Sequence, residues 1–414
     1  MTFRILTLAV LFGLCICLTA FSQTSRGGRI AYVRGSTEIR LIDPEGTNDR
    51  RLWTHPDLNE DLGIFELAWK PGGDELAFSS AHEATSSLYL ADIYTINSDG
   101  SGLQRLTNPP QRSGFAKFPK GSVTVKITNY QDAAEGSVTF IVYVAGADDP
   151  QQIFLPPGTS KTLTFKSVAD FGARAQPIVA MYGKFRWFTL GVDVRAGATV
   201  SAPTFTLTGK GYDMFGAFRP IWRSDGSRVS FRDGLCIVSN VPSKPTPGEY
   251  SFNQLFGGKN PMGTCTWDWG PTPATANQVI YSENSAGSNI YQMTEGGTHP
   301  GTKLTQFSDI DYQLLYDLKW MPDASGLLYS TVNLFRDSAN IYRYDFASKR
   351  TTQVTKLDKE FAREFTISPD SRYLAFERCP KADEDKGCDI WIIGTDGSKP
   401  HLLTRNGNRP AWAK

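Results

Sequence analysis

One short phrase recurs along this chain, and it constrains the fold more than any other feature. An aspartate or asparagine, an isoleucine and an aromatic residue stand together, and a short strand ending in threonine follows. The later copies lie about 50 residues apart, and a mostly β repeat of this length is typical of a radial or stacked array. The copies are Asp92-Ile93-Tyr94 with Leu106-Thr107, Asn289-Ile290-Tyr291 with Leu304-Thr305, Asn340-Ile341-Tyr342 with Val354-Thr355, and Asp389-Ile390-Trp391 with Leu403-Thr404.

A second pattern precedes most copies. A strand ending near a tryptophan runs into a turn of Pro, Asp or Gly, and an alternating apolar strand follows. Proline fixes φ, while glycine and aspartate tolerate positive φ, so these residues suit turns. Each period therefore contains four predicted antiparallel strands, A to D, which is the content of one propeller blade. The A strands end near Trp69, Trp222, Trp269, Trp320 and Ile367.

This pattern resembles the TolB-type β-propeller repeat, a relative of the WD-type repeats. The resemblance covers about 300 of the 414 residues. It implies an all-β fold built from radial blades. Because propellers host many unrelated activities, the resemblance leaves the function open.

The two ends of the chain are predicted to complete one blade together. Strands expected at 29–33, 38–42 and 51–53 have no tryptophan strand before them, whereas Asn408-Arg409-Pro410-Ala411-Trp412 matches Phe218-Arg219-Pro220-Ile221-Trp222. Pairing the ends would close the ring and remove exposed sheet edges. The prediction is a six-bladed β-propeller closed by the C-terminal strand.

One interval between consecutive A strands is much longer than the repeat. Trp69 and Trp222 are roughly 100 residues further apart than one period, and the extra segment contains six or seven short alternating runs. These runs indicate an Ig-like β-sandwich inserted between blades 2 and 3. The expected organisation is a signal peptide at 1–22, blades 1 and 2 at 23–113, the insert at 114–212, and blades 3 to 6 with the closing strand at 213–414.

The first residues predict the compartment. Arg4 precedes an apolar run from Ile5 to Leu18, and Ala20-Phe21-Ser22 offers small residues at a cleavage site. We interpret this as a secretory signal peptide rather than an uncleaved anchor, because the run is too short to span a bilayer stably. No later segment is apolar enough to span a membrane. A secreted or periplasmic protein is predicted, without a membrane span after cleavage.

Four of the six cysteines remain after the signal peptide. In an oxidising compartment an even number favours disulfides, with free buried thiols as the alternative. Cys379 and Cys388 flank a B–C loop, and Cys236 starts a C strand while Cys265 precedes an A strand. We predict the pairs Cys379–Cys388 and Cys236–Cys265. No histidine lies within ligand spacing of a cysteine, so no metal site is predicted.

Charge and motifs favour a protein without catalysis. The 43 basic and 42 acidic residues nearly cancel, so no field attracts nucleic acid. No G-x-S-x-G nucleophile elbow and no phosphate-binding glycine loop occurs in the sequence. Catalytic residues and cofactors are therefore predicted to be absent.

Charged residues at the starts of the A strands form the one candidate site. These positions should surround one mouth of the central tunnel, where they could bind a ligand or pair with one another. Because both signs are present, mutual pairing is the favoured interpretation. The residues are Glu66, Arg219, Asp317, Glu364 and Arg409.

Strand direction distinguishes the two faces of the predicted disc. One face carries short Pro-Asp-Gly turns, and the other carries the B–C loops and the D–A connections, including the insert. Binding residues usually lie on variable loops held by a rigid scaffold, so we expect the decorated face to bind the partner. The predicted function is a TolB-like non-catalytic scaffold for a protein or a cell-envelope polysaccharide, acting as a monomer or in an envelope complex. The alternative is a propeller hydrolase or lyase, or a small-ligand binder, that uses the tunnel mouth.

Overall fold

The computed structural model describes most of the chain. The described residues are 27–56, 63–108, 112–130, 138–172, 175–183, 185–209, 216–232, 236, 238–245, 266–282, 289–298, 300–307, 313–333, 338–380 and 387–413. The predicted signal peptide, 1–22, lies outside them. Within these ranges no helix has the length and apolar character needed to cross a membrane.

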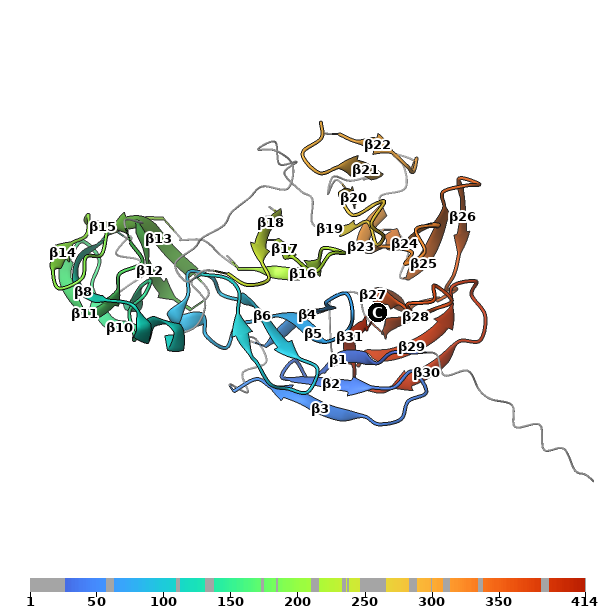
Figure 1. Ribbon diagram of the computed structural model, residues 1–414, viewed down its shortest axis with the longest axis horizontal. Helices are drawn as coiled ribbons and strands as arrows, with labels where there is room; N and C mark the ends of the chain where they lie inside the picture. Colours follow the sequence, from blue (N-terminus) through green and yellow to red (C-terminus); the bar gives the residue numbers. More distant parts are fainter. Residues whose placement is uncertain are drawn as a thin grey trace, which may run out of the picture.

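The two ends of the described chain meet in one sheet. Residue Ile30 pairs with Trp412, and Ala31 pairs with Ala411, in antiparallel register. The predicted pairing of the C-terminal strand with the first strand is therefore confirmed (Figure 1). The sheet has the order β3-β2-β1-β31, with β1 Ile30–Arg34, β2 Glu38–Ile42, β3 Arg50–Thr54 and β31 Asn408–Trp412.

The other sheets of the disc repeat this antiparallel order. The eight-stranded sheet contains two sets, β23 to β26 and β27 to β30, which are joined by the single pair Ala339 and Phe361. The strands are β4 Ile64–Trp69, β5 Glu75–Ser80, β6 Asp92–Asn97, β7 Gln104–Arg105; β16 Phe218–Trp222, β17 Arg228–Arg232, β18 Val238–Pro242; β19 Thr266–Trp269, β20 Gln278–Ser282, β21 Ile290–Thr294, β22 Thr302–Lys303; β23 Gln313–Trp320, β24 Gly326–Asn333, β25 Ala339–Asp345, β26 Arg350–Gln353; β27 Phe361–Ile367, β28 Tyr373–Cys379, β29 Asp389–Gly394 and β30 His401–Thr404.

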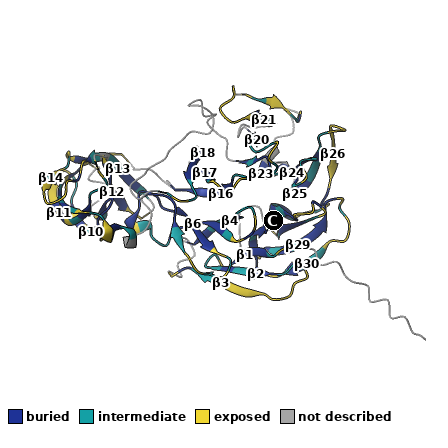
Figure 2. Cartoon of the chain, viewed as in Figure 1, coloured by how far each residue is buried: buried dark blue, intermediate teal, exposed yellow. Residues whose placement is uncertain are grey.

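The innermost strands form a ring. We call β31, β4, β16, β19, β23 and β27 the inner strands, and they contact one another in that cyclic order, with β27 returning to β31. Burial falls from the inner strands outward, and Figure 2 shows β3 and β26 largely exposed at the rim. The chain is thus an all-β propeller around a central channel.

A separate pair of sheets lies between β7 and β16 in the sequence and at the left of Figure 1. The sheets, β10-β9-β12-β13 and β11-β8-β14 with β15 beside β8, share one apolar core that includes Val125, Phe165, Val142 and Ala180. We call this pair the insert. Its strands are β8 Lys120–Asn129, β9 Val138–Val144, β10 Gln151–Leu155, β11 Ser160–Ala169, β12 Gln176–Tyr182, β13 Phe185–Val192, β14 Thr199–Ser201 and β15 Phe205–Leu207, preceded by the 3-10 turn η3 Arg112–Lys117.

The insert packs against the loop between β5 and β6. This loop contains the 3-10 turn η2 Ala84–Ser86, whose Ala84 carbonyl accepts a 3.3 Å hydrogen bond from Arg186 of β13. Leu88 and Tyr89 of the same loop belong to the core that contains Val179 and the rest of the insert. A shared apolar core and a buried guanidinium fix the insert on the side of the disc that carries the B–C loops.

The recurring sequence phrase is explained by a clamp between the C and D strands. The threonine hydroxyl accepts from the backbone N–H of the isoleucine and donates to the aspartate or asparagine side chain, so both strand ends are satisfied. In one copy Ile341 N to Thr355 Oγ1 is 2.8 Å and Thr355 Oγ1 to Asn340 Oδ1 is 3.0 Å. The same pair of bonds joins Asp92, Ile93 and Thr107, and joins Asn289, Ile290 and Thr305.

The aromatic residue of the phrase stacks on the neighbouring B strand. The rings of Phe78 and Tyr94 lie 5.6 Å apart, and those of Tyr329 and Tyr342 lie 5.5 Å apart. Each pair is directly opposite in the strand register, where cross-strand aromatic pairs stabilise a sheet. The phrase therefore has a structural role in each blade.

One predicted disulfide lies in the last blade. Cys379 and Cys388 are bonded, as predicted, and both are buried at the end of β28 and the start of β29. The sulfur of Cys236 is also disulfide-bonded, while its predicted partner Cys265 lies outside the described residues.

The clamp predicts a measurable contribution to stability. Thr355→Val keeps the shape of the side chain but removes the acceptor for Ile341 N–H and the donor to Asn340. We expect a loss of about 1–2 kcal/mol in the free energy of unfolding, measured by denaturant titration.

The matched control is Thr352→Val, which changes an exposed threonine of β26. Its expected effect lies within about 0.5 kcal/mol. Equal effects of the two substitutions would contradict the clamp.

Candidate functional site

The recurring tryptophans join the inner strands. Three indole N–H groups donate to a carbonyl of the preceding inner strand, whereas the indole of Trp269 donates to the Ser230 hydroxyl of β17. The three bonds between inner strands are Trp69 Nε1 to Ala411 O (3.0 Å), Trp222 Nε1 to Ala68 O (3.1 Å) and Trp320 Nε1 to Asp268 O (3.2 Å). All of these indoles are buried between blades. The tryptophans are thus inter-blade packing residues.

Carboxylates accept a second set of bonds that runs in the same direction, from the later inner strand to the preceding one. A side-chain oxygen on one inner strand accepts from a backbone N–H of the next, which satisfies groups that would otherwise face the channel unpaired. The bonds are Arg219 N to Glu66 Oε2 (3.1 Å), Trp320 N to Asp268 Oδ2 (2.8 Å) and Phe365 N to Asp317 Oδ2 (3.1 Å). Acidic residues of the inner strands therefore hold adjacent blades together.

The structure brings the five sequence-predicted residues around one small cavity. Glu66, Arg219, Asp317, Glu364 and Arg409 all line a space of about 20 Å³ at one mouth of the channel. A space of this size holds about one water molecule. We call these residues the mouth ring.

Ion pairing spans the mouth ring. Arg219 of β16 reaches past β19 to donate from Nη2 to Asp317 Oδ1 of β23, and both side chains are nearly buried. Arg409 Nη1 donates to the carbonyl of Ile64 at 2.7 Å. The two guanidinium groups are thus bound by protein groups of other blades, so the ring closes this mouth with polar contacts.

Both arginines of the mouth ring have unusual backbones. Arg219 has φ 55° and Arg409 has φ 54°, in the left-handed region that costs a residue with a side chain about 1–3 kcal/mol. Each is followed by a proline and lies where the register of its strand shifts. The left-handed turn directs the N–H of Arg409 to Glu377 and that of Arg219 to Glu66.

Glu377 was not among the residues predicted from the sequence. This residue of β28 is fully buried, and its carboxylate accepts from Arg363 Nη2 at 2.9 Å as well as from Arg409 N. A signal was present in the repeat. At the same position of the B strand three copies have serine and the first copy has Val33, whereas this copy has Glu377 and another has Arg232. Arg232 lies 4.0 Å from Glu66, so both charged exceptions contact the mouth ring.

Glu364 of the mouth ring has a strongly raised pKa. Loss of hydration, followed by repulsion from Glu377, raises the pKa of Glu364 to about 8, and Glu66 and Asp317 add to this. The positive charge of Arg409 opposes the rise. At neutral pH the carboxyl group of Glu364 is therefore mostly protonated, which lowers the negative charge of the ring.

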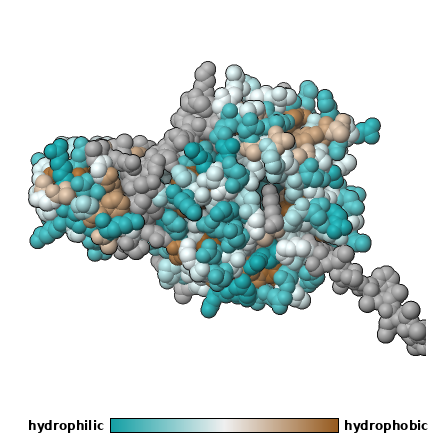
Figure 3. All heavy atoms as spheres, in the orientation of Figure 1, coloured by the Kyte–Doolittle hydropathy of each residue, from teal (hydrophilic) through white to brown (hydrophobic). Residues whose placement is uncertain are grey.

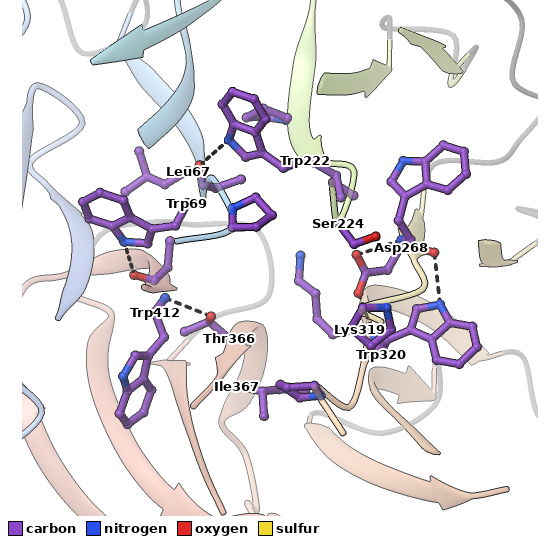
Figure 4. Close-up of a pocket in the computed structure, with 18 of the residues that line it drawn as sticks. Leu67, Trp69, Trp222, Ser224, Asp268, Lys319, Trp320, Thr366, Ile367 and Trp412 are labelled. Atoms are coloured by element: carbon purple, nitrogen blue, oxygen red, sulfur yellow. Dashed lines mark hydrogen bonds between the residues drawn. The ribbon is translucent and has the colours of Figure 1, made fainter. Parts of the chain in front are cut away.

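The opposite end of the channel is wider. A cavity of about 110 Å³ opens among the A–B turns, and its walls come from all of the inner strands (Figure 4). Leu67, Pro220, Phe365, Pro410 and Lys319 line both this cavity and the small one. These five residues therefore form the neck between the two ends of the channel.

Comparisons with known proteins give no family. No family model and no curated protein matches the chain. TolB from Acinetobacter baumannii is similar over 93% of this chain and 66% of its own, just under two thirds, with 12% identity and a TM-score of 0.41. A putative TolB from Agrobacterium tumefaciens (92% and 90%, 12% identity, TM-score 0.45) and a chain of a nidogen/laminin complex (94% and 99%, 10%, 0.43) are also similar.

The pKa of Glu364 predicts a pH-dependent stability. Its folded pKa of about 8 lies above the ordinary value of 4.5, so the unfolded state loses its proton first as pH rises. This group therefore lowers the stability of the protein progressively from about pH 4.5 to about pH 8. Glu364→Gln, which stays neutral, should raise the free energy of unfolding relative to wild type by about 1 kcal/mol or more at pH 8, and by little at pH 5.

Thermal unfolding of both proteins across this pH range is the measurement. Asp358→Asn, which removes an exposed carboxylate beside the same blade, is the control and should show a difference that does not grow with pH. If the difference in free energy of unfolding between Glu364→Gln and wild type is constant from pH 5 to pH 8, the raised pKa of Glu364 is contradicted.

Proposed function

We propose that this protein is a secreted or periplasmic TolB-like propeller that acts as a non-catalytic binding scaffold. In this proposal six blades form the closed ring, and the insert is an Ig-like β-sandwich carried between blades 2 and 3. The partner is a protein or a cell-envelope polysaccharide that binds the decorated face together with the insert.

The observation that carries the proposal is the location of the exposed aromatic residues. In the ranges that the structure describes, three large hydrophobic side chains are exposed: Tyr130 (62%), Phe154 (58%) and Tyr182 (48%). All three belong to the insert, and Figure 3 shows apolar side chains on the surface of this unit at the left of the view. Exposed aromatic residues are enriched at binding surfaces, because they bury large areas at a low entropic cost.

Tyr130 and Phe154 lie at the same end of the insert. Tyr130 follows Asn129, the last residue of β8, and Asn129 Nδ2 donates to the carbonyl of Leu155 at 2.9 Å. Leu155 in turn follows Phe154 at the end of β10. This side-chain bond brings the ends of the two strands together, although the strands belong to different sheets.

Tyr182 lies at this end too. Its ring is 6.3 Å from the ring of Phe140, and Phe140 pairs with Ile153, the residue before Phe154. We therefore treat Tyr130, Phe154 and Tyr182 as one aromatic end of the insert. The packing of the insert on η2 holds this end rigidly relative to the disc.

The enzyme alternative has weaker support. It needs charged residues of the mouth ring that are free to act on a substrate, but Arg219 and Asp317 bond to each other and Arg409 bonds to Ile64. The cavity between them has room for about one water molecule. The contacts of the ring favour the mutual pairing that its mixed charges predict.

The test compares wild-type protein with the variant Tyr130→Ser, Phe154→Ser, Tyr182→Ser. Both are immobilised and exposed to envelope material of the source cells, with and without protease treatment, so that a protein partner and a glycan partner are distinguished. We expect the triple variant to retain less than a tenth of the bound material. Hydrogen exchange of the wild-type complex should then show protection on the insert and the B–C loops.

Thr162→Ala with Thr164→Ala provides the matched control, because both threonines are exposed on β11 of the insert. The control variant should bind as wild type does. Undiminished binding by the triple variant, or protection confined to the Pro-Asp-Gly turns, would refute the proposal.

A further inference from the structure

We propose that the wide end of the channel is a binding site for a small carboxylate with a short apolar tail, and that Lys319 is its anchor. This site lies among the A–B turns, on the face opposite to the B–C loops. It is therefore independent of the scaffold function, and the failure of either proposal leaves the other intact.

The ammonium group of Lys319 has N–H donors that the described residues do not use. This group lies 3.6 Å from Asp317 Oδ1, and the described part of the chain gives it no hydrogen bond. Asp317 already accepts from Arg219, from Leu318 N at 2.8 Å and from Phe365 N. An ammonium group has three N–H donors, so Lys319 keeps donors for a ligand that enters the channel.

The orientation of Lys319 also supports this role. Figure 4 shows its side chain extending toward the middle of the cavity, and 28% of this side chain is exposed. The nearby acidic residue does not compete, since Asp268 Oδ1 accepts from Trp269 N at 3.0 Å and Asp268 Oδ2 accepts from Trp320 N. The positively charged group in the lining of the cavity is therefore Lys319, which is a hydrogen-bond donor.

The walls of the cavity determine the remainder of the ligand. They are made of proline rings and the buried indoles, and the indole N–H groups of Trp69, Trp222 and Trp320 are already used between blades. Such walls offer mainly apolar contact, and the hydroxyl groups of Ser224 and Thr366 are further polar groups of the lining. A cavity of about 110 Å³ is somewhat smaller than the roughly 150 Å³ that holds benzene, so a tail of two to four carbons fits.

The charges around Lys319 favour a monoanion. The carboxylate of Asp317 lies 3.6 Å from the ammonium group and Asp268 lines the same cavity, and their charges would repel the second charge of a phosphate. A carboxylate carries a single charge and accepts the hydrogen bonds that Lys319 can donate. A free short-chain acid and the C-terminal residue of a polypeptide share this chemistry.

The experiment titrates the full-length protein with propionate and follows tryptophan fluorescence, because several indoles line the cavity. Propionamide has the same shape without the charge. We expect saturable binding of propionate that is at least tenfold tighter than that of propionamide and weaker at high salt. A second arm uses a short peptide ending in alanine, with a free or an amidated C-terminus, to distinguish the two sources of the carboxylate.

Two variants test the role of Lys319. Lys319→Gln should weaken propionate binding at least tenfold, whereas Lys319→Arg, which keeps the charge, should retain binding within a few-fold. Lys70→Gln is the control, because Lys70 lies on the same face outside the cavity and pairs with Glu75. Melting curves establish that each variant is folded.

Two outcomes would overturn the proposal. The first is that neither propionate nor the peptide with a free C-terminus binds better than its amide. The second is that Lys319→Gln, when folded, binds the carboxylate as wild type does.

Discussion

Hydrogen bonds between inner strands are the interaction on which the rest of this structure depends. Each blade is a sheet whose innermost strand would leave backbone groups unpaired at the channel, and such groups are costly when buried. Tryptophan indoles donate to the preceding strand and carboxylates accept from the next. These bonds join β31 to β4, β4 to β16, β19 to β23 and β23 to β27, and the pairing of β31 with β1 closes the ring. Apolar packing between blades adds further stability to the hydrogen-bonded inner strands.

The same positions determine what the channel can do. The carboxylates of Glu66 and Asp317 accept hydrogen bonds from backbone groups of neighbouring blades, so these residues have a structural role. The pKa of Glu364 is raised, because burial removes hydration from its carboxyl group and the neighbouring Glu377 repels its charge. At the other end, Lys319 has a charge and few partners. The two ends of the channel therefore differ in whether their charged groups already have partners within the protein.

Sequence analysis predicted the features that a local repeat encodes. The recurring C and D strands, the tryptophan positions, the pairing of the last strand with the first and the Cys379–Cys388 bond all follow from residues that recur or lie close together. It could not predict which charges would pair, because Arg219 and Asp317 are distant in sequence and meet across the channel. Glu377 was missed because it lies on a B strand, outside the positions expected at the mouth. The left-handed backbone of Arg409 has no sequence signature beyond the proline that follows it.

Closure of the ring by its last strand has a consequence for biogenesis. The partner of β1 is β31, which is synthesised after every other strand of the described chain. Until then β1 presents an open sheet edge, and an open edge pairs readily with other chains. A molecule built in this way has an open edge throughout synthesis, and the edge becomes protected in a single late step. Chains interrupted before β31 are therefore expected to aggregate more readily than the closed ring, whatever the protein binds.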